Sequence, residues 1–164
     1  MDTGLFLKIL EDGLFAAMAA IGFSSISHTP SRMYFVCALA AAVGHSLRMI
    51  LMSPELLGIN IVPASAIAAL AVGLVAVLMA PLAKAPAEAC LFPALLPMIP
   101  GMYAYRTIEA LVGCLGASGE AEYSHFSYLL GYNSLTCVFI VLGMVIGANI
   151  PVFVLRKISF QATR

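Results

Sequence analysis

The chain has 164 residues, of which 62% are hydrophobic and only 10% are charged. A water-soluble domain of this length needs a larger polar surface than eight basic and eight acidic side chains provide. The composition therefore excludes an ordinary soluble domain and indicates an integral membrane protein. Because the net charge is zero, nothing suggests binding to nucleic acid.

The sequence lacks the patterns that metal sites, cofactors and common enzymes require. The four cysteines show no CxxC or Cys/His spacing and are interpreted as buried packing thiols: Cys37, Cys90, Cys114 and Cys137. No HExxH, Walker or GxSxG pattern is present. The first residues are net acidic, whereas a signal peptide requires a positive start. We therefore expect no catalytic residue, no metal, no cofactor and no cleaved signal peptide.

Five segments are apolar and long enough to cross a membrane, since a span needs about 20 residues. They cover residues 5–26, 30–52, 61–82, 87–113 and 126–155. We therefore expect an all-α polytopic membrane protein in which residues 1–164 form a single transmembrane domain. The main alternative has four spans, with the proline-rich segment 87–113 failing to cross.

Local signals predict where several of these helices begin and end. Thr29 should cap the second helix, with Pro30 in its first turn, so that the first two helices form a tight hairpin. Ser53 precedes Pro54 and should end the second helix, because proline disfavours a helical residue before it. Asn60 is a predicted cap for the third helix.

The basic residues predict how the chain is oriented in the membrane. With five spans, one side carries Arg32, Lys84, Arg156, Lys157 and Arg164. The other side carries Lys8, Arg48 and Arg106. By the positive-inside rule, we expect a cytoplasmic C-terminus and an N-terminus outside.

Two ionisable residues, His45 and Arg48, lie inside the second span and share one helix face. In one interpretation Arg48 extends to the membrane surface and His45 makes a hydrogen bond within the bundle. In the other they line a polar cavity, because ionisable residues in a span usually mark a substrate or proton path. Histidine titrates near neutral pH, and the arginine fork can hold a carboxylate through two hydrogen bonds.

The fourth segment contains Pro93, Pro97 and Pro100, followed by Gly101. Because each proline removes a donor and clashes with the carbonyl four residues earlier, a continuous helix through 96–101 is not expected. A helix starting near Gly101 would direct unpaired N–H groups at a cavity, as transporters do for substrate carboxylates. A plain kink is the alternative.

Other polar or small residues have weaker signals. Glu11 and Asp12 are adjacent, so only one should face inward. Tyr103 belongs either to the substrate site or, with Tyr105, to an interfacial aromatic belt. Arg106 and Glu109 are interpreted as a solvated or interfacial pair and not as a ligand clamp.

The fifth segment also carries two features of interest. Asn133 is a polar residue near its start, and Gly143 and Gly147 form a GxxxG pattern in its body. That spacing allows helices to approach closely and serves assembly more often than chemistry. An assembly of several copies of the chain is left open.

With these residues in place, the sequence resembles the small subunit of the threonine/serine exporter family over most of its length. The resemblance rests on two strings above all, GHxxRMILM at 44–52 and PMxPG at 97–101. Further matching positions are Asp12 with the Ala-rich run to Phe23, Pro30 to Arg32, Cys37 to Leu39, Tyr105, Asn133, Gly147, and Ile150-Pro151 before Arg156-Lys157.

The resemblance implies export of small amino acids or related carboxylates across the bacterial inner membrane, driven by an ion gradient. Some members hold a larger and a smaller half in one chain and others in two subunits, so a larger membrane subunit is the implied partner. We hypothesise that the substrate is bound by Arg48, Pro97, Pro100, Gly101, Tyr103 and Asn133. Proton coupling is assigned to His45 and Asp12, and helix packing to Gly143 and Gly147.

Two other classes of function are left open. The chain could be a structural subunit that supports a transport-competent partner without touching substrate. It could also be an intramembrane hydrolase, although adjacent residues such as His45 and Ser46 do not face each other and cannot form a nucleophile–base pair.

Overall fold

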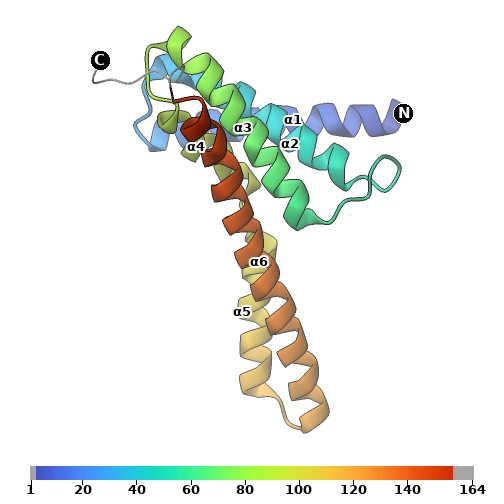
Figure 1. Ribbon diagram of the computed structural model, residues 1–164. Helices are drawn as coiled ribbons and strands as arrows, with labels where there is room; N and C mark the ends of the chain where they lie inside the picture. The colour runs from blue at the N-terminus through green and yellow to red at the C-terminus, as the bar shows by residue number, and fades with distance from the viewer. Residues whose placement is uncertain (1–2, 157–164) are drawn as a thin grey trace. The chain divides into compact units, whose positions relative to one another are not determined.

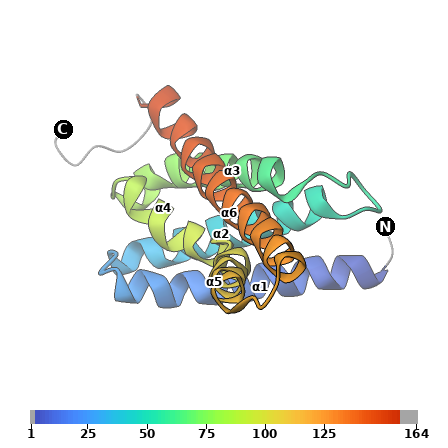
Figure 2. The ribbon, with the colours of Figure 1, turned by 90° about the horizontal axis from the view of Figure 1, so that it is seen from below.

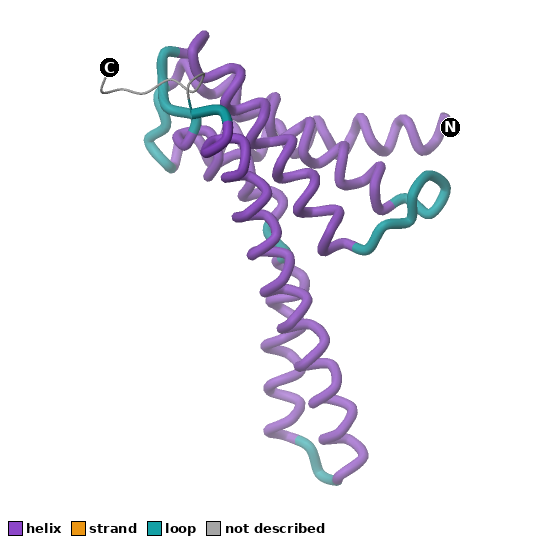
Figure 3. The backbone as a smooth tube through the Cα atoms, viewed as in Figure 1, coloured by secondary structure: helices purple, strands orange, loops and turns teal. Residues whose placement is uncertain are grey.

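The computed structural model describes residues 3–156, and every regular element in this range is a helix (Figures 1 and 3). The elements are α1 (Thr3–Ile26), the 3₁₀ helix η1 (Ser31–Met33), α2 (Tyr34–Met52), α3 (Ile61–Ala83), α4 (Glu88–Leu95), the 3₁₀ helix η2 (Leu96–Met98), α5 (Gly101–Gly116) and α6 (Glu120–Val154). The predicted all-α fold class is confirmed. Lys157 and Arg164, used to predict orientation, lie outside the described residues.

Three stretches within residues 3–156 are long and apolar enough to cross a membrane: Ser31–Met52, Ile61–Ala83 and Glu120–Val154. The Glu88–Met98 stretch is apolar but shorter. Helix α1 has 24 residues, but its first half carries three charged side chains, and it is not among the three. Several membrane-spanning helices are thus supported, and the count of five stays a prediction.

The chain divides into two compact units, which are described separately. Unit 1 contains the residues up to Met98 together with the end of α6 from Gly143 onward. Unit 2 is Ile99–Leu142, which comprises α5 and the larger part of α6. The expectation of a single transmembrane domain stays a prediction.

Helix α2 is the central element of unit 1, since it contacts α1, α3 and α4 (Figure 2). The α1–α2 contact is the most extensive, as expected for a tight hairpin. The residues buried on α3 are mostly alanines, with Val72 and Val77. Small side chains let helix backbones approach closely, so packing in this unit depends on close approach and not on bulky residues.

The end of α6 packs against α3 through glycines. A Cβ atom at Gly147 would lie 2.3 Å from the carbonyl oxygen of Ala66, and one at Gly73 would lie 2.3 Å from that of Ala148. A Cβ at Gly143 would lie 3.2 Å from the Cβ of Ala66. At this contact the two helix backbones touch, and only glycine leaves enough room.

The structure confirms two helix boundaries and corrects one. Asn60 caps α3, because its Oδ1 accepts a 3.1 Å hydrogen bond from the N–H of Val62. Helix α2 ends at Met52, just before Ser53 and Pro54. The prediction that Thr29 caps the second helix is wrong. Pro30 precedes the 3₁₀ turn with no side-chain cap, and the N–H of Thr29 donates instead to the carbonyl of Ser24 at the end of α1.

The fourth and fifth segments also differ from their expected bounds. Helix α4 ends at Leu95 and α5 starts at Gly101, so the α-helix is interrupted at the residues that include Pro97 and Pro100. That α4 and α5 together make one membrane crossing stays a prediction. Helix α6 starts at Glu120 and not at Phe126. In its first turn, the carboxylate of Glu122 accepts a 2.9 Å hydrogen bond from the N–H of Ser118, which precedes the helix.

The α3–α6 contact predicts a specific glycine requirement. Replacing Gly147 by alanine should lower the free energy of unfolding by about 1–3 kcal/mol, because its Cβ meets backbone that cannot move aside. The matched control is Gly131→Ala on the same helix, where a Cβ meets open space. That control should be neutral or stabilising by up to about 1 kcal/mol. Denaturation of the purified chain in mixed micelles measures both, and equal effects would contradict the prediction.

Candidate functional site

The side chains of Asp12 on α1 and His45 on α2 form a close polar contact inside unit 1. The Nδ1 atom of His45 lies 3.0 Å from Oδ2 of Asp12. The His45 side chain is only 11% exposed and that of Asp12 is 38% exposed. Glu11 is exposed, so Asp12 is the acid of this pair that faces inward. The contact joins two residues that are 33 positions apart in the sequence.

The other ring nitrogen of His45, Nε2, is buried and has no hydrogen-bond partner among the described residues. Leaving such an atom unpaired usually costs about 1–3 kcal/mol. A buried unsatisfied group that persists in a native structure is often tied to function. His45 therefore has an acidic partner at one ring nitrogen and no partner among the described residues at the other.

Close approach of α1 and α2 makes this contact possible. A Cβ at Gly13 would lie 2.6 Å from Oγ of Ser46, so any larger residue would push against that hydroxyl. Ser46 also donates a 3.4 Å hydrogen bond to the carbonyl of Ile9. The sequence analysis did not identify this role of Gly13.

Arg48 lies one turn beyond His45 on α2 and forms a hydrogen bond with the backbone of the turn that follows α4. Its Nη1 donates a 2.8 Å hydrogen bond to the carbonyl oxygen of Met98, in the 3₁₀ turn η2. Gly44 leaves room on this face of α2, because a Cβ there would lie 2.4 Å from Cγ2 of Val72 on α3 and 3.1 Å from Sδ of Met98. Pro97 lies in the same 3₁₀ turn and is half-buried. The sequence placed Arg48 and the prolines in one site but did not predict this hydrogen bond.

A cavity of about 490 Å³ opens beside these residues, where α1 begins and α2 ends. It is lined by Leu5, Lys8, Asp12, Arg48, Met49, Met52, Ser53, Pro54 and Glu55. Four of these residues are ionisable, two basic and two acidic. Asp12 belongs to both features, since it lines the cavity and contacts His45. The sequence did not point to Lys8 or Glu55 as lining residues.

The remaining predicted substrate residues lie in unit 2. At the start of α5, the N–H of Gly101 donates to the carbonyl of Ile99 at 2.8 Å. The N–H groups of Tyr103 and Ala104 donate to the carbonyl of Pro100 at 3.0 and 3.1 Å. Three of the first four N–H groups of α5 are thus already bonded to backbone, so this helix start offers a ligand fewer free donors than expected.

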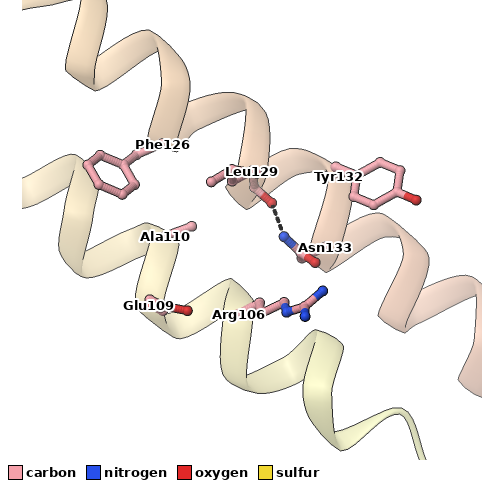
Figure 4. Close-up of a pocket in the computed structure, with 7 residues that line it drawn as sticks. All are labelled: Arg106, Glu109, Ala110, Phe126, Leu129, Tyr132 and Asn133. Carbon is pink, nitrogen blue, oxygen red and sulfur yellow. Dashed lines mark hydrogen bonds between the residues drawn. The ribbon is translucent and has the colours of Figure 1, made fainter.

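Asn133 lies on α6 and lines a second cavity within unit 2 (Figure 4). Its side chain is buried, and its Nδ2 donates a 2.7 Å hydrogen bond to the carbonyl of Leu129. Tyr103 is half-buried on α5, outside the residues that line this cavity. Tyr105 is 63% exposed. The structure therefore separates the predicted substrate residues into two groups.

Comparison with known proteins gives a family match over most of the chain. Residues 12–154 match the family described as "Threonine/Serine exporter, ThrE". A curated relative from Haemophilus influenzae, described as an uncharacterized protein, is 34% identical over 110 residues. The alignment covers 67% of this chain but 36% of the relative, so the chain spans about a third of that relative's length. No solved structure matches the chain.

The Asp12–His45 contact predicts an energetic coupling between the two residues. In a double-mutant cycle with Asp12→Asn and His45→Gln, we expect a coupling energy of about 1 kcal/mol in the free energy of unfolding, because one side chain loses its partner in each single variant. Denaturation in mixed micelles measures it. A parallel cycle with Glu11→Gln in place of Asp12→Asn should show no coupling, since Glu11 is exposed. Equal coupling in the two cycles would rule out a specific contact.

Proposed function

Because the chain belongs to the threonine/serine exporter family, we propose that it is the small membrane subunit of a secondary transporter that exports small amino acids or related carboxylates. The observation that carries the proposal is the placement of Asp12. Its carboxylate lines a charged cavity and also contacts the buried His45. One residue thus connects a space open to substrate with a group suited to carrying a proton.

Substrate recognition is assigned to the cavity beside Arg48. A guanidinium group has five N–H donors, and one hydrogen bond to the Met98 carbonyl leaves others free for a carboxylate. Asp12 and Glu55 can attract the ammonium group of an amino acid from the same cavity. The volume of about 490 Å³ is ample for a small amino acid with a few waters.

Proton coupling is assigned to the pair of Asp12 and His45. A proton that reaches the cavity can bind to Asp12 and be shared with His45, whose Nε2 has no partner among the described residues. Arg48 lies one turn away and stays positively charged. Substrate and proton would therefore bind to neighbouring groups. This arrangement lets proton binding be coupled directly to export of the substrate.

Our proposal for the membrane arrangement is the one predicted from the sequence. We propose five spans in the bacterial inner membrane, with α1 as the first and with α4 and α5 as two pieces of the fourth. The N-terminus would then be outside and the C-terminus cytoplasmic. Of the three charged residues in the first half of α1, Asp12 is compatible with a span because it pairs with His45 instead of facing lipid.

A larger membrane subunit is proposed as the partner. The aligned residues make up only 36% of the Haemophilus influenzae relative, which therefore holds a long region that they do not match. A separate subunit that carries such a region would complete the transporter. Co-purification with the membrane protein encoded beside this chain tests the partnership, and assembly of several copies can be read from the same preparation.

The proposed role of His45 should be visible in the pH dependence of export. In membrane vesicles that contain the chain and its partner, we expect His45→Gln to flatten the dependence of threonine export on pH, because glutamine cannot take up a proton. The matched control is His28→Asn, an exposed histidine with a positive φ of 53° that asparagine tolerates. Its pH profile should equal that of the wild type. An unchanged profile in His45→Gln would remove His45 from the coupling path.

The proposed binding of the substrate carboxylate by Arg48 should be visible in the KM for export. Arg48→Lys keeps the charge but loses the bidentate hydrogen bonding to a carboxylate, so we expect the KM for threonine export to rise about tenfold or more. Arg32→Lys is the control, since Arg32 is exposed on η1 outside the cavity. Kinetics of threonine transport in the same vesicles measure both. Normal KM in Arg48→Lys, together with normal export in His45→Gln, would favour a structural subunit that does not contact substrate.

A further inference from the structure

Unit 2 contains its own cavity between α5 and α6, with a volume of about 330 Å³ (Figure 4). It is lined by Arg106, Glu109, Ala110, Phe126, Leu129, Tyr132 and Asn133. The proposed transport site in unit 1 uses none of these residues, although Asn133 was assigned to substrate binding from the sequence. The chemistry of this second cavity therefore remains to be explained.

The two charged residues of the cavity are not paired with each other. Arg106 and Glu109 are three residues apart on α5, a spacing at which opposite charges commonly meet. Within residues 3–156 the charged contact closer than 4.0 Å is that of His45 with Asp12, and Arg106 and Glu109 do not form one. Both side chains border the cavity from the α5 side (Figure 4). A positive and a negative group are thus both available to a ligand.

Asn133 faces these charges from α6. It is only 4% exposed, and its Nδ2 is fixed by a 2.7 Å hydrogen bond to the carbonyl of Leu129. That bond orients the amide, so its oxygen is left as an acceptor. Figure 4 shows Asn133 and Arg106 extending from the two helices into the space between them. Arg106 and the Asn133 amide therefore offer a cation and a neutral acceptor that face each other, and Glu109 adds an anion one turn farther along α5.

The remaining wall is apolar and partly aromatic. Ala110 and Leu129 are small or medium-sized, and Phe126 and Tyr132 provide rings. Gly113 makes room for the Phe126 ring, because a Cβ at Gly113 would lie 2.4 Å from its Cδ1 atom. Charges of both signs beside a short apolar wall suit a small molecule that carries an ammonium group, a carboxylate and a short side chain on one carbon atom.

We propose that this cavity is a second binding site for a zwitterionic α-amino acid. Arg106 binds the carboxylate, Glu109 and the oxygen of Asn133 bind the ammonium group, and the side chain lies against Ala110 and Leu129. The identity of the ligand as a small amino acid rests on the proposed transport function. The site itself is built from residues of unit 2 alone.

Binding can be followed with a single reporter, because the chain contains no tryptophan. Tyr132→Trp places the reporter at the cavity, where the native ring is 53% exposed and leaves room for an indole. In the purified full chain, we expect millimolar L-threonine to change the tryptophan emission in a saturable manner. Absence of any change would overturn the proposal.

Ligand analogues test the role of each charge. Threonine amide lacks the carboxylate and N-acetylthreonine lacks the ammonium group. Arg106→Gln should weaken threonine binding about tenfold or more and leave binding of threonine amide unchanged. Glu109→Gln should weaken threonine and leave N-acetylthreonine unchanged. Glu120→Gln, an exposed acid at the start of α6, is the matched control and should change nothing. Equal losses for all three ligands would overturn the proposed roles.

A second measurement needs no tryptophan. Threonine should raise the unfolding temperature of an Arg48→Lys chain, and adding Arg106→Gln should abolish that increase; persistence of the increase would overturn the proposal.

The same variants separate this site from the transport function. If Arg106→Gln exports threonine with a normal KM and shows no change in binding, the second site is wrong while the transport proposal stands. If threonine binds with the expected analogue pattern but is not exported, the site stands and the transport proposal fails.

Discussion

The contact between Asp12 and His45 is the constraint on which unit 1 depends. Ionisable groups are costly inside an apolar chain, and bringing these two within 3.0 Å lets each stabilise the other. The contact requires α1 and α2 to lie close together, which Gly13 permits. It also fixes how far one helix is shifted along the other. With that register, Arg48 lies one turn from His45 and lines a cavity.

Arg48 links this hairpin to the interrupted backbone after α4. Prolines leave carbonyl groups without helical partners, and irregular backbone is tolerated at membrane depth only where other groups satisfy it. The guanidinium of Arg48 supplies such a partner for the carbonyl of Met98. The same side chain also lines the cavity of unit 1. A change at this residue should therefore affect the turn and the cavity together.

Each unit contains a cavity with charges of both signs, although the chain as a whole is neutral. A zwitterion is the simplest small molecule that complements such a lining. In unit 1 the acid is coupled to a buried histidine, whereas in unit 2 the charges face a fixed amide. Our proposals accordingly assign proton-coupled transport to the first cavity and binding alone to the second.

The sequence by itself determined the membrane class, the approximate helices, the interruption near Pro97 and Pro100, and the cap at Asn60. These features follow from hydropathy and from rules that act within a few residues. The tertiary structure decided that Asp12 and not Glu11 faces His45, and that Arg48 bonds the Met98 carbonyl. It also decided that Arg106 and Glu109 stay apart. Those outcomes depend on which helix faces meet, and local sequence patterns carry no information about contacts between residues tens of positions apart.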